Sequence, residues 1–379
     1  MWLCGCGSVD KALRARQPLL LSKITNGFTV SKALLSSIFL VAAVSLASAG
    51  DAYKWSVSYI IDNSESVAGR SQMVFPRRNR GLAISPDGRF LYAGYHHSFD
   101  GHGEVRRIAT DVADFGRATA AVMPGPLAKA IATDDKGRVY IADSNEIVVC
   151  DAELQHRLFR IPIGVCEGIA TARDGGTLLL FTSDRETGTI QRWVITEKDS
   201  TISDAKLAGF DGTGTFKVPN AQDLRGLKVD SRGNIWVCDL TGGHVFRVRK
   251  DGKDVKSVDM KSPIDVAFDK GRAFITRWTD RGITVIDEEL VVIGNLNVPW
   301  QELALSPFGN SKYGALSGIV TVPGRGFFVS NEGGQTAGQL SIYGKPDRFS
   351  GEIEGVSFKD TRNDDNDPIL KATEVTTGQ

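Results

Sequence analysis

The chain has 379 residues, of which 41% are hydrophobic and 24% are charged, and it contains 41 glycines and 13 prolines. These values are typical of a globular protein, and the glycine content suits a turn-rich all-β fold. The 45 basic and 45 acidic side chains balance, so no global positive field favours nucleic acid as a partner.

The first 49 residues are predicted to be a signal peptide rather than part of the fold. Lys32 precedes an apolar run, and Ala47-Ser48-Ala49 has the small-x-small pattern that signal peptidase accepts. The run is too short for a transmembrane helix, so cleavage after Ala49 leaves no expected membrane span. We expect a secreted or periplasmic protein, and an uncleaved membrane anchor is the alternative. Residues 30–49 form a complete bacterial-type signal, so the residues before them are interpreted as a misassigned extension.

One phrase recurs six times between residues 80 and 332: a short apolar strand, a turn rich in glycine and aspartate, and a second apolar strand. The copies begin at Gly81, Ala130, Gly168, Gly226, Asp265 and Gly318. Their spacing is close to the roughly 40–50 residues of a four-stranded propeller blade. Such a unit cannot bury its apolar face alone and must stack against its copies. The sequence therefore predicts an all-β, six-bladed β-propeller over residues 50–347.

Each repeat is expected to contain further strands, and the ring is expected to close through the N-terminal segment. Third strands are predicted to begin at Gly103, Glu146, Thr189, His244, Gly282 and Gly338. Fourth strands are predicted at His156 and Val291. The last repeat lacks a fourth strand, so the alternating run 53–61 is expected to complete that blade. A seventh, degenerate blade is the alternative.

The tail after the propeller, 348–379, is polar and includes the acidic stretch 363–367. The spacing of this stretch does not fit an EF-hand calcium loop, so we expect a solvated tail lying on the propeller.

Three cysteines follow the leader, and an odd number leaves at least one thiol free in an exported protein. Cys150 and Cys166 flank one predicted strand, and a disulfide between them is one option. Cys238 lies in the apolar run IWVCDL and is predicted to be a small buried hydrophobic residue.

The phrases GLKVDSRGNIWVCDL and AIATDDKGRVYIADS resemble the repeats of gluconolactonase/regucalcin-like propellers and of the neighbouring NHL-repeat proteins. The resemblance covers nearly the whole chain after the leader, and it is specific for the fold more than for a function. In the gluconolactonase-like enzymes a divalent cation sits at the mouth of the central tunnel. Its ligands are Glu, Asn and Asp residues directly before the glycine that opens the first strand of several blades.

In this chain the corresponding position holds Arg80, Lys129, Glu167, Arg225, Ile264 and Ser317. A hard cation needs several oxygen ligands, and only Glu167 offers a carboxylate. We therefore predict no cofactor, and a calcium ion is disfavoured. The three cations are instead predicted to form a positive tunnel mouth, where Arg80 and Arg225 grip a carboxylate, sulfate or phosphate. The alternative is that these side chains pair with acids of neighbouring loops and fill the channel.

The loops after the second strand of each repeat are expected on the same face as the tunnel mouth. The loop 95–102 contains His96, His97 and His102, which are weak candidates for a transition-metal site or for general acid–base catalysis. Metal ligation through this loop would also use Asp100.

Other residues of these loops are candidates for binding or for turn capping. Asp143, Asp184 and Asp239 stand at matching places just past the second strand, and capping of their own turns is favoured over metal ligation. Trp278 beside Arg277 is a candidate for stacking on a sugar or an aromatic ligand. A tryptophan partly buried between blades is the equal alternative.

The sequence contains no GxSxG nucleophile elbow, no HExxH and no phosphate-binding glycine loop. The leading hypothesis is an exported monomer that binds a small anionic or carbohydrate-like ligand, or a partner protein, at the tunnel mouth without catalysis. The first alternative is a lactonase-like or esterase-like hydrolase that uses a histidine of 95–102, with Arg80 or Arg225 stabilising an oxyanion. The second alternative is a protein–protein interaction scaffold.

Overall fold

A computed structural model describes residues 54–58, 77–97, 103–110, 118–125, 127–143, 145–279, 282–297, 316–322, 326–331, 339–344, 356–362 and 368–375. The chain divides into two compact units, Met1–Val44 and Ser45–Gln379, and every described residue belongs to the second. All regular elements among these residues are β-strands. No helix in the described ranges is long and apolar enough to cross a membrane. The predicted signal peptide lies outside the described residues.

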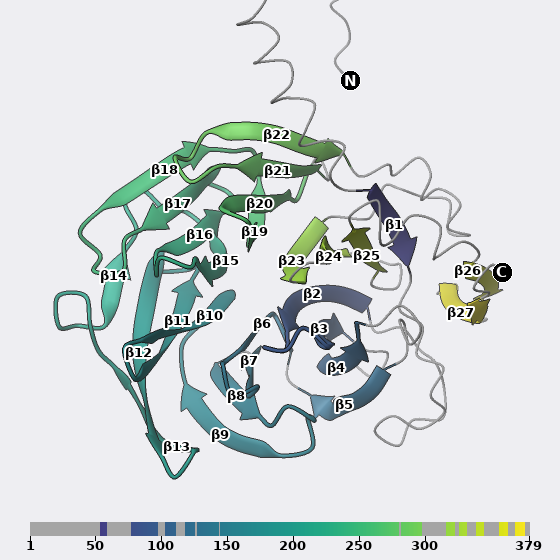
Figure 1. Ribbon diagram of the computed structural model, residues 1–379, viewed down its shortest axis with the longest axis horizontal. Helices are drawn as coiled ribbons and strands as arrows, with labels where there is room; N and C mark the ends of the chain where they lie inside the picture. Colours follow the sequence, from purple (N-terminus) through teal and green to yellow (C-terminus); the bar gives the residue numbers. More distant parts are fainter. Residues whose placement is uncertain are drawn as a thin grey trace, which may run out of the picture. The chain divides into compact units, whose positions relative to one another are not determined.

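Five antiparallel blades are each built from consecutive strands (Figure 1). The first contains β2 (Arg77–Ile84), β3 (Phe90–His97), β4 (Gly103–Ala109) and β5 (Ala118–Gly125). The second contains β6 (Ala130–Thr133), β7 (Val139–Asp143), β8 (Glu146–Cys150) and β9 (Arg157–Pro162). The third contains β10 (Gly168–Asp174), β11 (Thr177–Asp184), β12 (Thr189–Lys198) and β13 (Thr201–Leu207), and the short strand β14 (Thr215–Lys217) pairs with β12.

The fourth blade contains β15 (Leu224–Val229), β16 (Ile235–Asp239), β17 (His244–Val248) and β18 (Val255–Asp259). The fifth contains β19 (Pro263–Asp269), β20 (Arg272–Arg277), β21 (Gly282–Ile286) and β22 (Val292–Asn297). The fourth strands predicted at His156 and Val291 correspond to β9 and β22. The all-β propeller fold is thus confirmed.

A further four-stranded sheet is assembled from the two ends of the repeat region. It contains β23 (Leu316–Val322), β24 (Gly326–Asn331) and β25 (Gln339–Gly344), with β1 (Lys54–Ser58) antiparallel to β25 at its outer edge. The N-terminal strand therefore pairs where the sequence analysis placed it. Consecutive strands complete five blades where six repeats were counted, because the last repeat supplies only three strands of its own.

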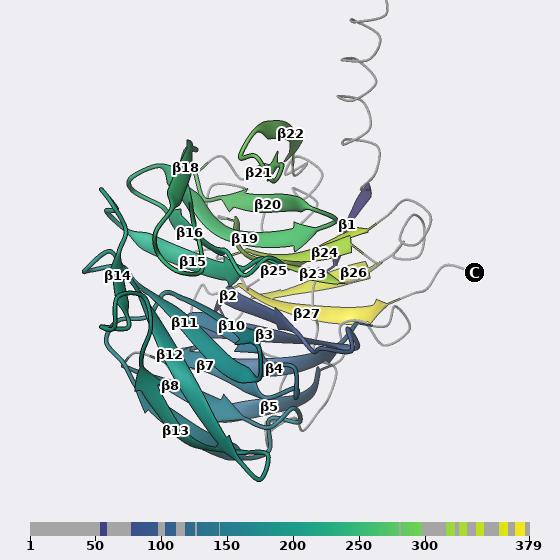
Figure 2. The ribbon, with the colours of Figure 1, turned by 60° about the vertical axis from the view of Figure 1, so that its left-hand side comes forward.

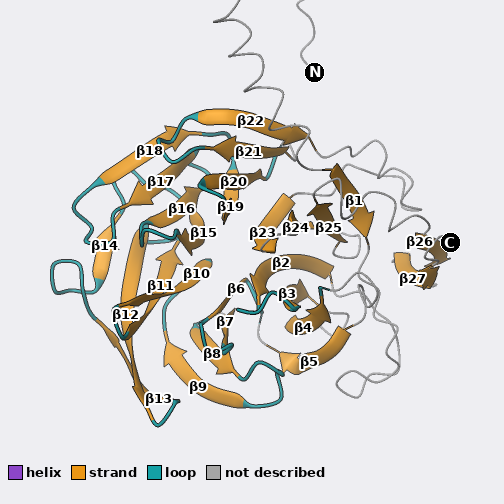
Figure 3. Cartoon of the chain, in the orientation of Figure 1, coloured by secondary structure: helices purple, strands orange, loops and turns teal. Residues whose placement is uncertain are grey.

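The first strand of each sheet is the innermost one (Figures 1 and 3). Inner strands β2, β6, β10, β15, β19 and β23 contact one another in this order, and β23 contacts β2. Figure 2 shows several of these sheets side by side, seen from the edge of the ring. Ser330 Oγ on β24 also donates a hydrogen bond to the Arg80 carbonyl on β2 at 3.2 Å, which joins the last sheet to the first.

The aspartate of the repeated phrase organises the turn between the first two strands of a blade. In the second blade, Asp134 Oδ1 accepts the Arg138 amide at 3.0 Å, and the Tyr140 hydroxyl donates to Asp134 Oδ2 at 3.0 Å. In the fourth blade, Trp236 Nε1 donates to Asp230 Oδ2 at 2.9 Å. The phrase recurs in the sequence because the aspartate satisfies turn amides while an aromatic side chain on the next strand bonds to it.

The glycines that open inner strands are required by the approach of the next blade. A Cβ on Gly168 would stand 2.2 Å from the Arg225 carbonyl oxygen, and a Cβ on Gly318 would stand 2.1 Å from the Arg80 carbonyl oxygen. No side chain fits at these distances, so the backbones of neighbouring blades meet at the axis only because glycine stands there.

The hydrophobic core lies between adjacent sheets, and the three described thiols are part of it. Cys150 and Cys166 are free and belong to different core clusters, so the disulfide option for this pair is wrong. Burial raises the pKa of Cys150 to about 11 and that of Cys166 to about 12. Cys238 is fully buried, as predicted for a small hydrophobic residue. These thiols are therefore unreactive at neutral pH.

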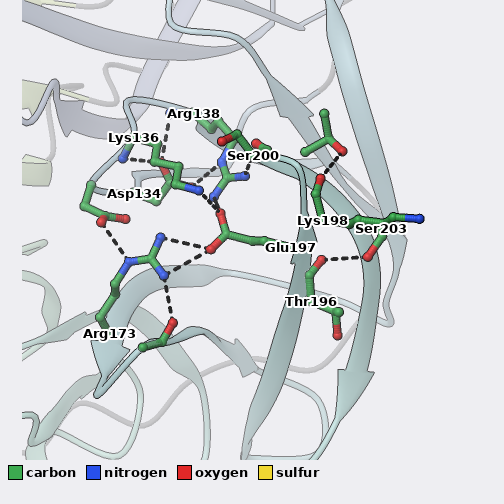
Figure 4. Close-up of polar contacts among 12 residues, drawn as sticks. Asp134, Lys136, Arg138, Arg173, Thr196, Glu197, Lys198, Ser200 and Ser203 are labelled. Atoms are coloured by element: carbon green, nitrogen blue, oxygen red, sulfur yellow. Dashed lines mark hydrogen bonds and ion pairs between the residues drawn. The ribbon is translucent and has the colours of Figure 1, made fainter.

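A network of ion pairs joins the second and third blades (Figure 4). The carboxylate of Glu197 lies 2.8 Å from Lys136 Nζ, 2.6 Å from Arg138 Nη2 and 3.1 Å from Arg173 Nη1. Burial alone would raise the pKa of Glu197, but the hydrogen bonds from these three cations lower it to about 2. Every charge here is satisfied within the protein, so the network stabilises the stacking of two blades.

The C-terminal tail contains a two-stranded antiparallel sheet that the sequence analysis did not predict. It consists of β26 (Val356–Arg362) and β27 (Pro368–Val375). The acidic stretch 363–367 lies outside the described residues.

Candidate functional site

The residues directly before the start of each repeated phrase come together at one end of the tunnel. Arg80, Lys129, Glu167, Ile264 and Ser317 line a cavity of about 20 Å³, together with the first residues of the inner strands. These residues lie on, or directly before, at least five different inner strands. The charged side chains at this end therefore come from blades that are far apart in the sequence.

Glu167 is the centre of the charged cluster, and none of its side chain is exposed. Its Oε2 lies 2.6 Å from Arg80 Nη2 and 3.1 Å from Arg225 Nη1. Its Oε1 lies 3.2 Å from Lys129 Nζ and 3.5 Å from Arg185 Nη1. Burial alone would raise the pKa of Glu167, but the charges of Arg80, Arg225 and Lys129 hold this pKa below its ordinary value. The carboxylate is therefore ionised and shared by four cations.

The cluster keeps an excess of positive charge. Besides Glu167, Asp223 takes part, because Arg225 Nη2 donates to Asp223 Oδ2 at 2.9 Å. Among the described ion pairs of the cluster, four cations thus face two carboxylates, a difference of 4 − 2 = 2 charges. The Arg185 side chain is 42% exposed, whereas that of Arg225 is 15% exposed. A ligand from solvent therefore meets Arg185 first.

Hydroxyl groups fix the backbone at these positions. In three blades, a side-chain hydroxyl near the end of the second strand donates a hydrogen bond to a backbone carbonyl of the next sheet. The accepting residue stands directly before the glycine that opens the repeated phrase. These bonds run from Ser183 to the Arg225 carbonyl at 2.6 Å, from Thr276 to the Ser317 carbonyl at 2.6 Å and from Ser330 to the Arg80 carbonyl at 3.2 Å. The Arg80 and Arg225 backbones are thereby held at the axis, and their side chains reach Glu167 from the first and the fourth blade.

The residues at the mouth do not fit the divalent cation of the gluconolactonase-like enzymes. Both carboxylate oxygens of Glu167 already lie against cations, and Ile264 and Ser317 bring no carboxylate. Within the described ranges, no group of three or more histidine, cysteine or acidic side chains could hold a metal ion. A divalent cation here would face four positive side chains at close range, which Coulomb repulsion opposes.

The three weak metal candidates at the ends of second strands accept hydrogen bonds from backbone amides. Asp143 Oδ1 accepts the Leu127 amide at 2.9 Å. Asp184 Oδ1 accepts the Glu186 amide at 2.9 Å, and Asp239 Oδ1 accepts the Asp223 amide at 2.8 Å. Asp184 thus caps its own turn, as does Asp239, whose Oδ1 also accepts the Gly242 amide at 3.0 Å, whereas Asp143 bonds an amide 16 residues earlier. Asp239 also positions Asp223 beside Arg225.

The histidine loop of the first repeat is shorter than predicted. β3 continues to His97, and residues 95–97 belong to this strand, with His97 opposite Arg77 on β2. The loop prediction is therefore wrong for His96 and His97, because pairing with β2 extends the strand. The side chains of both, and the whole of 98–102 with His102, lie outside what the structure describes.

Arg277 and Trp278 lie apart from the charged cluster. They stand at the end of β20, and neither lines the cavity. Trp278 is half-buried, and its amide donates to the Ser262 carbonyl at 2.8 Å. The Arg277 guanidinium lies against Gly282, where a Cβ would clash with it. The alternative of a partly buried tryptophan fits this position.

Sequence reasoning did not include Arg185 or Asp223 in the cluster. Neither residue stands directly before the start of a repeated phrase, so the repeat does not predict that they lie at the tunnel mouth. The available signal was the expectation that the loop after β11 opens on the same face as the tunnel mouth.

Comparisons with known proteins place these features in context. A protein-family model described as "SMP-30/Gluconolactonase/LRE-like region" matches residues 82–279, which is more than half of the chain. Among solved structures, the chain is similar to a selenomethionine-substituted virginiamycin B lyase from Staphylococcus aureus (12% identity, 77% of this chain and 99% of that chain covered, TM-score 0.47). It is also similar to a chain of a nidogen/laminin complex (16% identity, 59% and 82% covered, TM-score 0.47). A Kuenenia stuttgartiensis hydrazine synthase is a further match (16% identity, 70% and 82% covered, TM-score 0.45). No curated protein sequence matches the chain.

Proposed function

The chain belongs to the SMP-30/gluconolactonase/LRE-like family, and we propose that it binds a small anionic ligand at the tunnel mouth without catalysing a reaction. The observation that carries this proposal is the gathering of Arg80, Lys129, Arg185 and Arg225 around the single carboxylate of Glu167. Such a cluster has an unbalanced positive charge in a partly buried setting. An anion entering the mouth would neutralise it.

The ligand chemistry follows from the donors. The guanidinium of Arg185 has a fork geometry that matches carboxylate, sulfate and phosphate oxygens, and Lys129 adds a point charge. Charge-assisted hydrogen bonds of this kind contribute about 1.5–3 kcal/mol each when partly desolvated. The mouth is narrow, so a small carboxylate or a sugar acid fits the proposal better than an extended polyanion.

The proposal is tested by titrating the purified protein with citrate, glucuronate, sulfate and phosphate in a calorimeter at low ionic strength. We expect at least one of these anions to bind, with an affinity that falls as salt is added. Arg185→Gln should weaken binding about tenfold, equivalent to 1.4 kcal/mol. The matched control is Arg160→Gln, because Arg160 lies 3.6 Å from Glu146 on an exposed surface and should not affect binding.

Two outcomes would refute the proposal. One is the absence of binding for every anion, or equal affinities in the Arg185 and Arg160 variants. The other is a rise in the thermal midpoint when calcium, zinc or magnesium is restored to chelator-treated protein. Such a rise would show a metal site in the folded state, and it would favour the hydrolase alternative. Release of acid from a lactone in proportion to protein concentration would support that alternative directly.

Two finer features belong to the same proposal. We propose that β1 with β23–β25 acts as a sixth blade that closes the propeller, supported by the pairing of β1 with β25 and by the bond from Ser330 to Arg80. We also propose that the protein is exported after cleavage behind Ala49, supported by the small-x-small pattern there. N-terminal sequencing of protein recovered from the cell exterior or periplasm, beginning at Gly50, would test the second.

A further inference from the structure

One lysine interrupts a row of small residues along the tunnel. Two residues beyond the start of each repeated phrase, the six inner strands carry Ala83, Ala132, Ala170, Lys228, Ala267 and Val320. The fold accepts alanine or valine at this position in the other five strands. The repeat therefore does not require a lysine at position 228, and this lysine brings an ammonium group to the tunnel wall.

Lys228 stands between two cavities. Together with Leu82, Ile131 and Ile169, it lines both the cavity at the charged mouth and a second cavity. The second cavity has a volume of about 220 Å³ and is formed by the later residues of the inner strands, so it opens toward the opposite end of the tunnel. This lower cavity, as we call it, shares these four residues with the charged mouth and extends away from it along the tunnel.

The wall of the lower cavity is apolar. It includes the row of alanines, Val229, Phe268 and Val320, with threonines toward its opening. Thr133 Oγ1 donates to the Ile84 carbonyl at 2.6 Å, and Thr171 Oγ1 donates to the Thr133 carbonyl at 2.6 Å. The hydroxyl protons of Thr133 and Thr171 are used to join neighbouring inner strands, so these two residues have no proton left to donate to a ligand.

The ammonium of Lys228 lacks a direct partner within the described part of the protein. Lys228 is half-buried, and it forms no ion pair or hydrogen bond with another described residue. Asp265 on the neighbouring inner strand interacts with Lys228 electrostatically without a direct contact. Asp265 Oδ2 accepts the Ile319 amide at 3.0 Å. A partly buried cation without a close counter-ion is costly, and an anionic group beside it would lower that cost.

We propose that the lower cavity binds an unbranched aliphatic carboxylate, with its carboxylate at Lys228 and its chain along the apolar wall toward the threonines. Charge complementarity selects an anionic head, and the alanine-rich wall selects an unbranched apolar body. This site goes beyond the ligand proposed at the charged mouth, because it takes amphipathic anions at the other end of the tunnel.

The test is calorimetric titration of the intact protein with hexanoate, octanoate, decanoate and octanol, each below its micelle concentration. Every CH₂ group that enters an apolar site should strengthen binding about fourfold, so decanoate should bind more than tenfold tighter than octanoate. Octanol should bind more weakly than octanoate, because it lacks the charge that Lys228 recognises.

Variants separate the head from the tail. Lys228→Met should weaken octanoate binding at least tenfold and leave octanol binding unchanged, whereas Lys256→Met, at an exposed lysine on the outer strand β18, should change neither. Val320→Phe fills part of the lower cavity and should abolish binding of the longest chain while Lys228 is intact. Thermal midpoints of all variants check that the fold is kept.

The proposal is overturned if affinity does not depend on chain length, or if the Lys228 and Lys256 variants bind octanoate equally. It is also overturned if Val320→Phe folds normally and binds decanoate as the wild type does. Val320→Phe, at a residue that lines the lower cavity and not the charged mouth, should leave citrate and sulfate binding at the mouth unaltered. The two sites can therefore fail or succeed separately.

Discussion

Replacing Glu167 with glutamine is the sharpest test of how the tunnel mouth is balanced. The change keeps the size of the side chain and removes the one charge that four cations share at 2.6–3.5 Å. Removal of one partner from a buried ion pair costs about 3–5 kcal/mol. For a domain of this size, each kcal/mol lowers the thermal midpoint by roughly 2–4 °C. We therefore expect the midpoint to fall by about 10 °C.

The same substitution should strengthen anion binding. It raises the local charge from two to three positive units, because Asp223 becomes the only carboxylate left in the cluster. One added unit charge at about 5 Å contributes on the order of 3 kcal/mol at an effective dielectric constant of 20, before screening by salt. A gain of about tenfold in affinity at low salt is a conservative expectation.

Differential scanning fluorimetry and calorimetric titration measure the two effects on one preparation. Glu146→Gln is the control, because this carboxylate is 3.6 Å from Arg160 in a partly exposed pair that contributes less than about 1 kcal/mol. Loss of stability together with unchanged or weaker anion binding at low salt would refute the reasoning. It would mean that the cations hold Glu167 in place but do not face a ligand.

Two further changes test the construction of the axis. Gly318→Ala should lower the unfolding midpoint because its Cβ would stand 2.1 Å from the Arg80 carbonyl oxygen, whereas Gly176→Ala has nothing within 4 Å and is the control; equal midpoints would contradict the packing argument. Asp265→Asn should stabilise the protein at pH 7, since burial raises the pKa of Asp265 above 3.8. The stability contributed by the protonated acid is present below that unfolded value and is lost as pH rises through the folded-state pKa, so urea unfolding should show no advantage for the variant near pH 3.5.

Local chemistry explains why so much of the fold could be predicted from the sequence. Asp134 and Asp230 each satisfy the amides of a short turn, and Gly168 and Gly318 allow close contact with the next blade. These needs arise within a few residues of chain and repeat with every blade, so they leave a periodic pattern. The pairing of β1 with β25 was predictable for a related reason, because the last repeat lacks a fourth strand.

Contacts that depend on distant loops left no such pattern. Arg185 reaches Glu167 from the end of β11, and Asp223 is held beside Arg225 by the cap at Asp239. Neither contact follows from the spacing of the repeat. The pairing of β26 with β27 was missed because their sequence is too polar to indicate strands with a buried face.

The positions where this chain departs from its own repeat are those where we expect functional residues. Glycine or alanine opens five of the six repeated phrases, and the remaining phrase opens with Asp265. Alanine or valine follows two residues later, except at Lys228. An ionisable group at such a position loses solvation, and nothing in the propeller fold requires it. A sequence that specifies one structure follows its local structural preferences except at functional or strained sites. We therefore expect function at the two ends of the tunnel, where Lys228, Asp265 and Glu167 lie.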